Sequence, residues 1–199
     1  MISEILLVAF AYLLGSVPTG YILGHLSGVD VRKAGSGNVG ATNVARVAGK
    51  KLGIFTLIGD AAKGFLPVYL AQRLGFDATF VGLAALAAFL GHLFPVFLKF
   101  SGGKGVATAL GALLALTPAA AGALVIVFLV TALAGRIVSL ASIAAAATAP
   151  VAVWLLGYPA VTTAVVTAMA LLIIWRHEKN IHRLMAGAEP KFSAKKLSN

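Results

Sequence analysis

Long runs of apolar residues constrain this chain more than any other feature of its sequence. Stretches of about 18 or more apolar residues, the length of a helix that crosses a bilayer, recur along the chain. The chain is 60% hydrophobic and only 11% charged, far outside the range of soluble globular domains. A transmembrane barrel would instead show short segments of alternating polarity. The sequence therefore predicts an all-α integral membrane protein, with residues 1–199 forming a single transmembrane domain.

The basic residues indicate which side of the membrane each loop faces. Most of the 16 lysines and arginines, which give a net charge of +10, fall into four regions. These regions are the loop at residues 32–51, the loop at residues 99–104, the turn at Arg136 and the tail from Arg176 to Lys196. Because cytoplasmic loops carry the excess of lysine and arginine, all four regions are predicted to be cytoplasmic. Topology and an anionic substrate explain the charge, and no nucleic-acid partner is expected.

The apolar runs predict seven transmembrane helices, some short or broken, with the N-terminus outside and the C-terminus cytoplasmic. The expected spans are residues 2–26, 52–73, 79–100, two within 105–135, 139–156 and 160–175. Residues 15–20 interrupt the first span, where neighbouring helices or polar groups must satisfy the freed carbonyls. The 31 residues from 105 to 135 fit two crossings only as short helices turning at residues 117–118, with a re-entrant pair as the alternative. The tail after His182 is expected to be only partly ordered.

Two opposite charges lie within the second span. Asp60 and Lys63 are three residues apart, which places them on one face of a helix, where they can neutralise each other. A structural pair and a functional site both remain open at this position.

The loop from Gly35 to Arg46 has the composition of an anion site. Its three glycines allow backbone N–H groups to turn toward one point. The loop contains no carboxylate, so a metal ion is not expected there. The neutral donors and the cation that it adds are Ser36, Asn38, Thr42, Asn43 and Arg46.

A second polar island, at residues 101–105, contains Gly102, Gly103 and Lys104. The helix expected to begin near Val106 points its N-terminus at this island. Because a helix N-terminus carries unpaired N–H groups and partial positive charge, this arrangement also favours an anion.

Further polar residues lie at the expected cytoplasmic ends of the last two spans. Ser139 and Ser142 are three residues apart, and His177 and Asn180 have the same spacing at the inner end of the last helix, so each pair shares a helix face. The neighbouring basic side chains, expected to extend toward the membrane surface, are Arg176, Lys179 and Arg183. Each pair alone is common at a membrane boundary, but together the polar islands on one side of a small bundle predict a functional site.

Three familiar motifs lack the context that would support them. Residues 35–40 match the dinucleotide fingerprint, but a membrane span precedes them and no βαβ unit fits. Residues 102–105 lack the first glycine and the Ser/Thr of a Walker loop. His25 and Asp30 have the spacing of a thioester-dependent acyltransferase pair, yet a boundary histidine is the simpler interpretation of a two-residue match. We therefore expect no cofactor and no metal.

With these motifs in hand, the chain resembles the bacterial acyl-phosphate-dependent glycerol-3-phosphate acyltransferases, the PlsY family. The resemblance covers nearly the whole chain in order, through residues 35–46, 91–108, 136–142 and 177–189. Members transfer a long acyl group from acyl phosphate to the sn-1 hydroxyl of glycerol 3-phosphate, giving lysophosphatidic acid and phosphate. The resemblance implies a seven-span protein of the bacterial cytoplasmic (inner) membrane with a cytoplasmic active site. Its partners would be glycerol 3-phosphate, a long-chain acyl phosphate and membrane lipid.

The resemblance also implies roles for individual residues. Those implied to hold the phosphate of glycerol 3-phosphate are Ser36, Arg46 and Lys104, and those implied to position its hydroxyls are His177 and Asn180. Those implied to bind the acyl phosphate are Asn38, Gly40, Thr42 and Ser142, with Gly102 and Gly103 nearby. The expected catalytic residues are Lys104, His177, Asn180 and Ser142. An acyl phosphate is already activated, so direct attack requires no nucleophilic serine or cysteine.

Two alternatives stay open. The proton acceptor is either His177 or the leaving phosphate; His92 is also matched but lies deeper in its span. The phosphate is favoured, because Glu178, the one carboxylate considered for orienting the imidazole of His177, faces elsewhere on its helix. The alternative function is a membrane carrier for a phosphorylated solute, which should show an internal repeat and polar groups continuing to the outer leaflet. The sequence does not give the oligomeric state.

Overall fold

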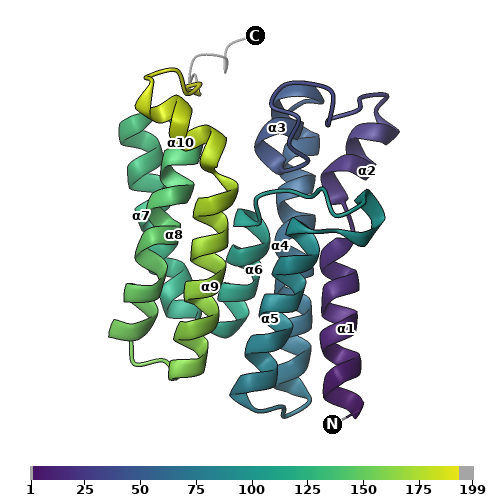
Figure 1. Cartoon of the computed structure of the whole chain (residues 1–199), viewed down its shortest axis with the longest axis vertical. Coiled ribbons are helices and arrows are strands. Elements are labelled where there is room, and N and C mark those ends of the chain that lie inside the picture. The colour runs from purple at the N-terminus through teal and green to yellow at the C-terminus, as the bar shows by residue number, and fades with distance from the viewer. Residues whose placement is uncertain (1, 193–199) are drawn as a thin grey trace.

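The computed structural model describes residues 2–192, which form a single elongated bundle of helices (Figure 1). Within these residues all regular structure is helical, as expected from the apolar runs. The elements are α1 (Ile2–Ser16), α2 (Thr19–Leu26), α3 (Ala41–Val47), α4 (Lys50–Arg73), α5 (Ala78–Leu93), the 3-10 helix η1 (Val96–Leu98), α6 (Val106–Leu116), α7 (Pro118–Gly135), α8 (Val138–Leu155), α9 (Ala160–Arg176) and α10 (Glu178–Met185).

The long helices match most of the expected spans within a few residues. In residues 2–192, five segments are long and apolar enough to cross a membrane, or six if α9 and α10 count as one span bent by 58°. The remaining apolar helix, α6, has only 11 residues. It therefore rises roughly 16 Å, about half the thickness of the hydrocarbon core. The turn at Thr117 between α6 and α7 is confirmed, while the count of seven spans stays a prediction.

The third expected span ends earlier than its apolar run. Helix α5 stops at Leu93, and the chain continues through η1 and an irregular segment to the start of α6 at Val106. Pro95 follows the helix and cannot supply a backbone N–H to it, which is consistent with this early end. Residues 94–100, which were expected to complete the third span, therefore lie outside helix α5.

The break in the first span is confirmed, together with the way its backbone is satisfied. Helix α1 ends at Ser16 and α2 begins at Thr19. The carbonyl oxygen of Val17, within the break, accepts a hydrogen bond of 2.8 Å from Nζ of Lys63. A neighbouring helix thus supplies the donor that a broken membrane helix needs.

Small residues let two pairs of helices approach closely. A Cβ on Gly15 would lie 2.1 Å from the carbonyl oxygen of Ala88, so α1 and α5 are in backbone contact there. Helices α4 and α6 meet in the same way, where a Cβ on Gly64 would lie 2.1 Å from the carbonyl oxygen of Thr108. Such close contacts drive association where lipid offers no hydrophobic advantage.

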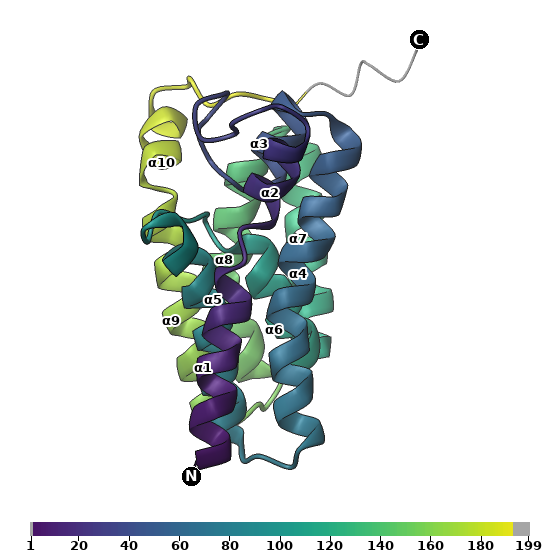
Figure 2. The same cartoon turned by 90° about the vertical axis from the view of Figure 1, so that its right-hand side faces the viewer.

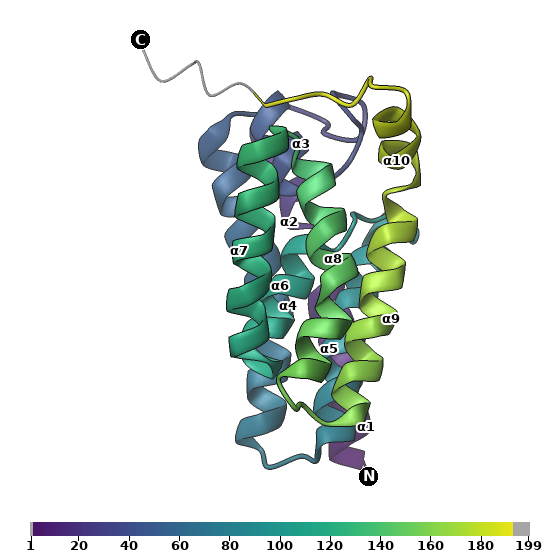
Figure 3. The same cartoon turned by 90° about the vertical axis from the view of Figure 1, so that its left-hand side faces the viewer.

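The two ends of the bundle differ in character. The N-terminus and the turns between α4 and α5 and between α8 and α9 lie at one end, and α2, α3 and α10 lie at the other (Figures 2 and 3). Between these ends the sides carry exposed apolar side chains, including Ile58, Ile126, Trp154 and Leu171. An apolar exterior of this kind is the surface that contacts lipid. The polar loop between α2 and α3 and the charged helix α10 lie at the same end of the bundle.

Candidate active site

The loop between α2 and α3 is organised around one buried side chain, Asn43. Its Oδ1 accepts a hydrogen bond of 2.8 Å from the backbone N–H of Ser36. Its Nδ2 donates to the carbonyl oxygens of Val31, Ala34 and Asn38, at 2.9 to 3.1 Å. The sequence predicted Asn43 as a donor toward an anion, and this is wrong, because its side chain makes four hydrogen bonds within the loop.

Gly35 shows why this loop needs glycine. Its φ is +61°, and a Cβ there would lie 2.3 Å from Oδ1 of Asn43. The other loop residues with expected roles remain at the surface: Ser36, Thr42 and Arg46 are exposed, and Asn38 is half-buried. Asn38 also shapes the loop, because its Oδ1 accepts from the backbone N–H of Gly40 at 2.7 Å.

Replacing Asn43 with alanine is expected to destabilise the protein by roughly 2 to 4 kcal/mol, since several buried backbone groups lose their partner. Thermal unfolding of the purified protein in detergent measures this loss. Thr42→Ala is the matched control, because Thr42 is exposed on α3; it should unfold with the wild type. Equal melting temperatures for Asn43→Ala and the wild type would contradict the assigned role of Asn43.

The segment that carries Lys104 is fixed by backbone hydrogen bonds on both of its sides. The N–H groups of Gly102 and Gly103 donate to the carbonyl oxygens of Leu93 and His92, each at 3.1 Å. Their own carbonyl oxygens accept from the guanidinium of Arg176, at 2.7 and 3.1 Å. The glycine N–H groups are therefore not free to bind an anion. The expectation that Arg176 extends toward the membrane surface is wrong, because its guanidinium holds this loop.

Lys104 is the cation at the centre of the site. Its Nζ donates to Oδ1 of Asn180, so the two predicted catalytic residues are in contact. Burial, together with the positive charges of Arg183, Arg176 and Arg46, lowers the pKa of Lys104 to about 8, although Glu189 opposes the shift. Cations from α3, α9 and α10 are thus close enough to repel Lys104. Such a site favours an anion that would relieve the repulsion.

Glu189 is a residue whose role the sequence analysis missed. Its Oε1 accepts from Oγ of Ser139 at 2.6 Å and from Nδ2 of Asn180, and its Oε2 accepts from Nε of Arg183 at 2.6 Å. These hydrogen bonds lower the pKa of Glu189 against the opposing effect of burial. Because an amide that donates Nδ2 to a carboxylate must present Oδ1 elsewhere, Glu189 orients Asn180 toward Lys104. Its match within the resemblance, at residues 177–189, was the available signal.

The described part of the tail after His182, residues 183–192, is held against the rest of the chain. Helix α10 continues to Met185, and the backbone N–H of Phe192 donates to the carbonyl oxygen of Arg136 at 2.8 Å. This contact and Glu189 attach the segment to the turn before α8. The cations Lys195 and Lys196 lie outside the described residues.

His177 and Asn180 do not share one helix. Helix α9 ends at Arg176, and the chain bends by 58° into α10, with His177 at the junction. Both side chains are nevertheless buried beside Lys104, whose charge, after burial itself, helps to lower the pKa of His177 to about 4. Nδ1 of His177 lies 2.8 Å from the carbonyl oxygen of Ile173. Because a carbonyl can only accept, Nδ1 carries the proton and Nε2 is the acceptor of a neutral ring.

The premise that only Glu178 could orient this imidazole is therefore wrong. Glu178 is exposed, and its Oε1 lies 4.0 Å from Nε2 of His182, which is also exposed. The carbonyl of Ile173 orients the ring of His177 instead, and Glu189 is the carboxylate inside the site.

Ser142 and the His25–Asp30 pair are the remaining candidates from the sequence. Ser142 is buried on α8, and its Oγ donates to the carbonyl oxygen of Val138 within the helix at 2.9 Å. Oδ1 of Asp30 lies 3.1 Å from Nε of Arg32, so Asp30 pairs with Arg32 rather than with His25, which is exposed. This arrangement offers no support for a histidine–aspartate pair. In the part of the chain that the structure describes, no group of three His, Asp or Glu side chains could hold a metal ion.

Comparisons with known proteins agree with this arrangement. The family model for glycerol-3-phosphate acyltransferase matches residues 5–187. The glycerol-3-phosphate acyltransferase of Geobacter metallireducens is 52% identical over 195 residues, covering 98% of this chain and 100% of the relative. The enzyme of Geotalea daltonii is 48% identical over 192 residues, and the alignment covers 96% of this chain and 99% of the relative.

Two solved structures have the same fold. Both are crystal structures of PlsY (YgiH), an integral membrane glycerol 3-phosphate acyltransferase, and each alignment covers 96% of both chains. The glycerol 3-phosphate form superposes with a TM-score of 0.93 at 46% identity, and the lysophosphatidic acid form with 0.90 at 45%. This chain therefore belongs to the glycerol-3-phosphate acyltransferase family.

Proposed function

We propose that this protein transfers an acyl group from acyl phosphate to the sn-1 hydroxyl of glycerol 3-phosphate, giving lysophosphatidic acid and inorganic phosphate. The observation that carries the proposal is the half-buried Lys104, which contacts Asn180 and is repelled by Arg46, Arg176 and Arg183, with Glu189 nearby. Two phosphates must be brought together in this reaction, and cations offset their repulsion. The solved relatives, in glycerol 3-phosphate and lysophosphatidic acid forms, support the acceptor and the product.

We assign the acceptor to the cationic side of the site. Its phosphate would bind Ser36, Arg46 and Lys104, which lie on the α2–α3 loop, α3 and the loop before α6. Its hydroxyls would be positioned by His177 and Asn180. The acyl phosphate would bind near Asn38, Gly40, Thr42 and Ser142, beside the Gly102–Gly103 backbone. Because the glycine N–H groups already donate to α5, side chains and the N-terminus of α6 would supply the donors.

The reaction itself needs no covalent intermediate. The sn-1 hydroxyl oxygen attacks the acyl carbonyl carbon, a new C–O ester bond forms, and the bond to the phosphate oxygen breaks. The hydroxyl proton passes to the leaving phosphate. His177, with a pKa near 4, is a weak base at neutral pH, so its Nε2 serves to align the hydroxyl. The leaving phosphate dianion is a stronger base than this imidazole and is therefore the better proton acceptor.

We also propose the membrane arrangement. Seven spans, with α6 as the short one, would place the N-terminus outside and the site at the cytoplasmic face of the inner membrane. The segments α3 and α10, which carry described basic residues, lie at one end of the bundle, which supports this orientation (Figure 1). Backbone without helical structure before α6 is compatible with membrane depth because the bundle buries Gly103 and Gly105.

The pKa of Lys104 predicts how acceptor binding depends on pH. The ammonium group is present below about pH 8 and is lost above it. Affinity for glycerol 3-phosphate, whose phosphate keeps its charge in this range, should therefore fall about tenfold between pH 7 and pH 9. Calorimetry at constant ionic strength measures the change. Lys104→Met should bind weakly at both pH values without this fall; a wild-type affinity that does not change between them would contradict the assignment.

Product analysis separates the acyltransferase from the carrier. Purified protein in liposomes is given labelled glycerol 3-phosphate and acyl phosphate. Formation of 1-acyl-glycerol 3-phosphate supports the proposal. Uptake of glycerol 3-phosphate into the liposomes without acylated product would favour a carrier for a phosphorylated solute and overturn it.

A further inference from the structure

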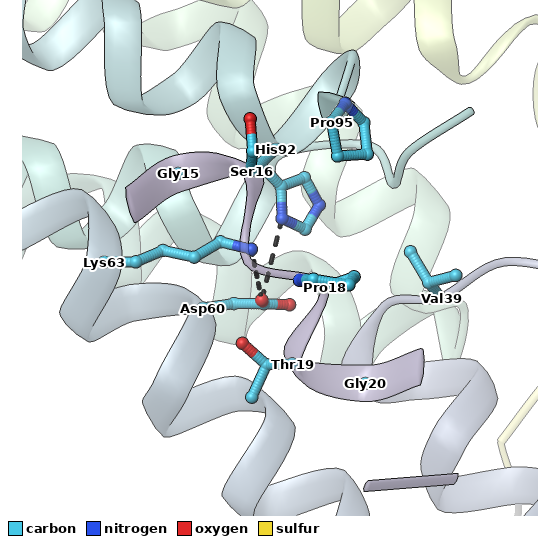
Figure 4. A pocket seen from close by; sticks show the side chains of 10 residues that line it. All are labelled: Gly15, Ser16, Pro18, Thr19, Gly20, Val39, Asp60, Lys63, His92 and Pro95. Carbon is cyan, nitrogen blue, oxygen red and sulfur yellow. Dashed lines mark ion pairs between the residues drawn. The ribbon is translucent and has the colours of Figure 1, made fainter. Parts of the chain in front are cut away.

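A buried charged cluster lies beside the site without belonging to it. Asp60 and Lys63 on α4 and His92 on α5 are 2%, 5% and 6% exposed. Oδ1 of Asp60 lies 2.9 Å from Nζ of Lys63 and 3.6 Å from Nδ1 of His92 (Figure 4). The expected neutralisation of Asp60 by Lys63 is confirmed. That His92 joins them from another helix was not predicted.

The cluster connects two irregular segments of backbone. On one side, Nζ of Lys63 donates to the carbonyl oxygen of Val17 in the break between α1 and α2. On the other side, the carbonyl oxygen of His92 accepts from the N–H of Gly103. The ring is also close, since a Cβ on Gly103 would lie 2.2 Å from Nε2 of His92. The imidazole therefore supports the backbone of the residue that precedes Lys104.

A small cavity lies between these groups. Its volume is about 10 Å³, and Asp60, Lys63, His92 and Ser16 are among the residues that line it (Figure 4). Among residues 2–192, Oγ of Ser16, Oδ1 of Asp60 and Nδ1 of His92 are buried without a hydrogen-bond partner of suitable geometry. The cavity is about the size of one water molecule.

Neutralisation alone does not explain this arrangement. A buried ion pair costs desolvation energy, and apolar residues of similar size often serve stability equally well. A pair that only neutralised itself would also need no histidine, and no contact to the loop of Lys104. The contacts instead resemble those by which outer residues fix the groups that bind a ligand.

We propose that Asp60, Lys63 and His92 are positioning residues: the ion pair fixes the imidazole, and the imidazole fixes the Gly102–Gly103 backbone and hence Lys104. The inference deepens the proposed function and rests on it for its kinetic consequences. Its structural consequence, a loop held by the cluster, does not depend on the reaction.

The decisive variant removes both charges together. Asp60→Leu/Lys63→Met leaves no unpaired charge, so a purely neutralising pair predicts an unchanged loop. Our proposal predicts faster hydrogen–deuterium exchange of the backbone at residues 101–105, by roughly tenfold or more. It also predicts a KM for glycerol 3-phosphate raised by roughly tenfold, beyond any fall in kcat. Thr162→Val, which alters a buried polar residue on α9, is the control. Its loop exchange and its KM for glycerol 3-phosphate should both match those of the wild type.

A second pair of variants tests the ring if the double variant does not fold. Gly103→Ala places a methyl group against Nε2 of His92 and should raise the KM for glycerol 3-phosphate. His92→Ala/Gly103→Ala makes room for that methyl group, so loop exchange should be slower and KM lower than in His92→Ala alone. A double variant no better than His92→Ala would overturn the support of this loop by the ring.

The two levels of failure are distinguishable. Faster loop exchange in Asp60→Leu/Lys63→Met, combined with a wild type that makes no lysophosphatidic acid, supports the positioning and contradicts the proposed function. Wild-type exchange and wild-type KM in that double variant overturn the positioning, whatever the reaction.

Discussion

Replacing Lys104 with alanine is expected to abolish turnover, by roughly a thousandfold or more, while the protein stays folded in the membrane. The variant removes the cation that we assign to the phosphate of glycerol 3-phosphate and that contacts Asn180. It should not reduce the melting temperature, because burial and three nearby arginines disfavour the charged ammonium in the free protein. Turnover and thermal unfolding of the same preparation measure both effects.

Lys179→Ala is the matched control for Lys104→Ala. Lys179 is an exposed lysine on α10, so its loss should leave turnover close to that of the wild type. Full activity in Lys104→Ala would remove Lys104 from the site. A variant that is inactive only because it unfolds would show a lowered melting temperature, contrary to the expectation.

Replacing Glu189 with alanine is expected to lower kcat/KM by roughly a hundredfold, because a mispositioned catalytic group costs about that much. The variant removes the acceptor that orients Asn180 and that also binds Ser139 and Arg183. Glu189→Gln should retain more activity than Glu189→Ala, since its amide oxygen can still accept from Asn180 and Ser139. Steady-state kinetics of the two variants test this order.

The control for Glu189 is another acid of the same segment. Glu178 lies on α10, but its side chain is exposed and is paired with His182. Glu178→Ala should therefore match the wild type. If Glu178→Ala and Glu189→Ala lose activity equally, the effect comes from the net charge of the segment and not from orientation of Asn180.

Much of the fold could be predicted because membrane insertion leaves a plain signal. The apolar runs gave the bounds of α4, α8 and α9 to within about two residues, and the break near Pro18 followed from its glycines and proline. The early end of α5 and the 58° bend at His177 could not be predicted. Both depend on contacts from distant residues, such as the hydrogen bonds from the glycine loop back to the carbonyls of α5.

For the candidate site, the residues themselves were easier to predict than the hydrogen-bond partners of each side chain. The sequence identified Lys104 and Asn180, which lie in contact, but it could not show that Asn43 serves its own loop. It matched Glu189 only through the resemblance and gave it no role, because a carboxylate in a basic tail gains meaning only when the tail folds back onto α8. His92 was recognised by resemblance alone, and its place beside Asp60 follows from the packing of α4 against α5.

The donor is the most direct test of the proposed reaction. Purified, detergent-solubilised protein is given glycerol 3-phosphate with acyl phosphate, acyl-CoA or acyl carrier protein thioester in parallel, and lysophosphatidic acid and released phosphate are measured. We predict both products from acyl phosphate and neither from the thioesters. Lysophosphatidic acid from thioesters only would contradict the proposed reaction and would return attention to His25 and Asp30.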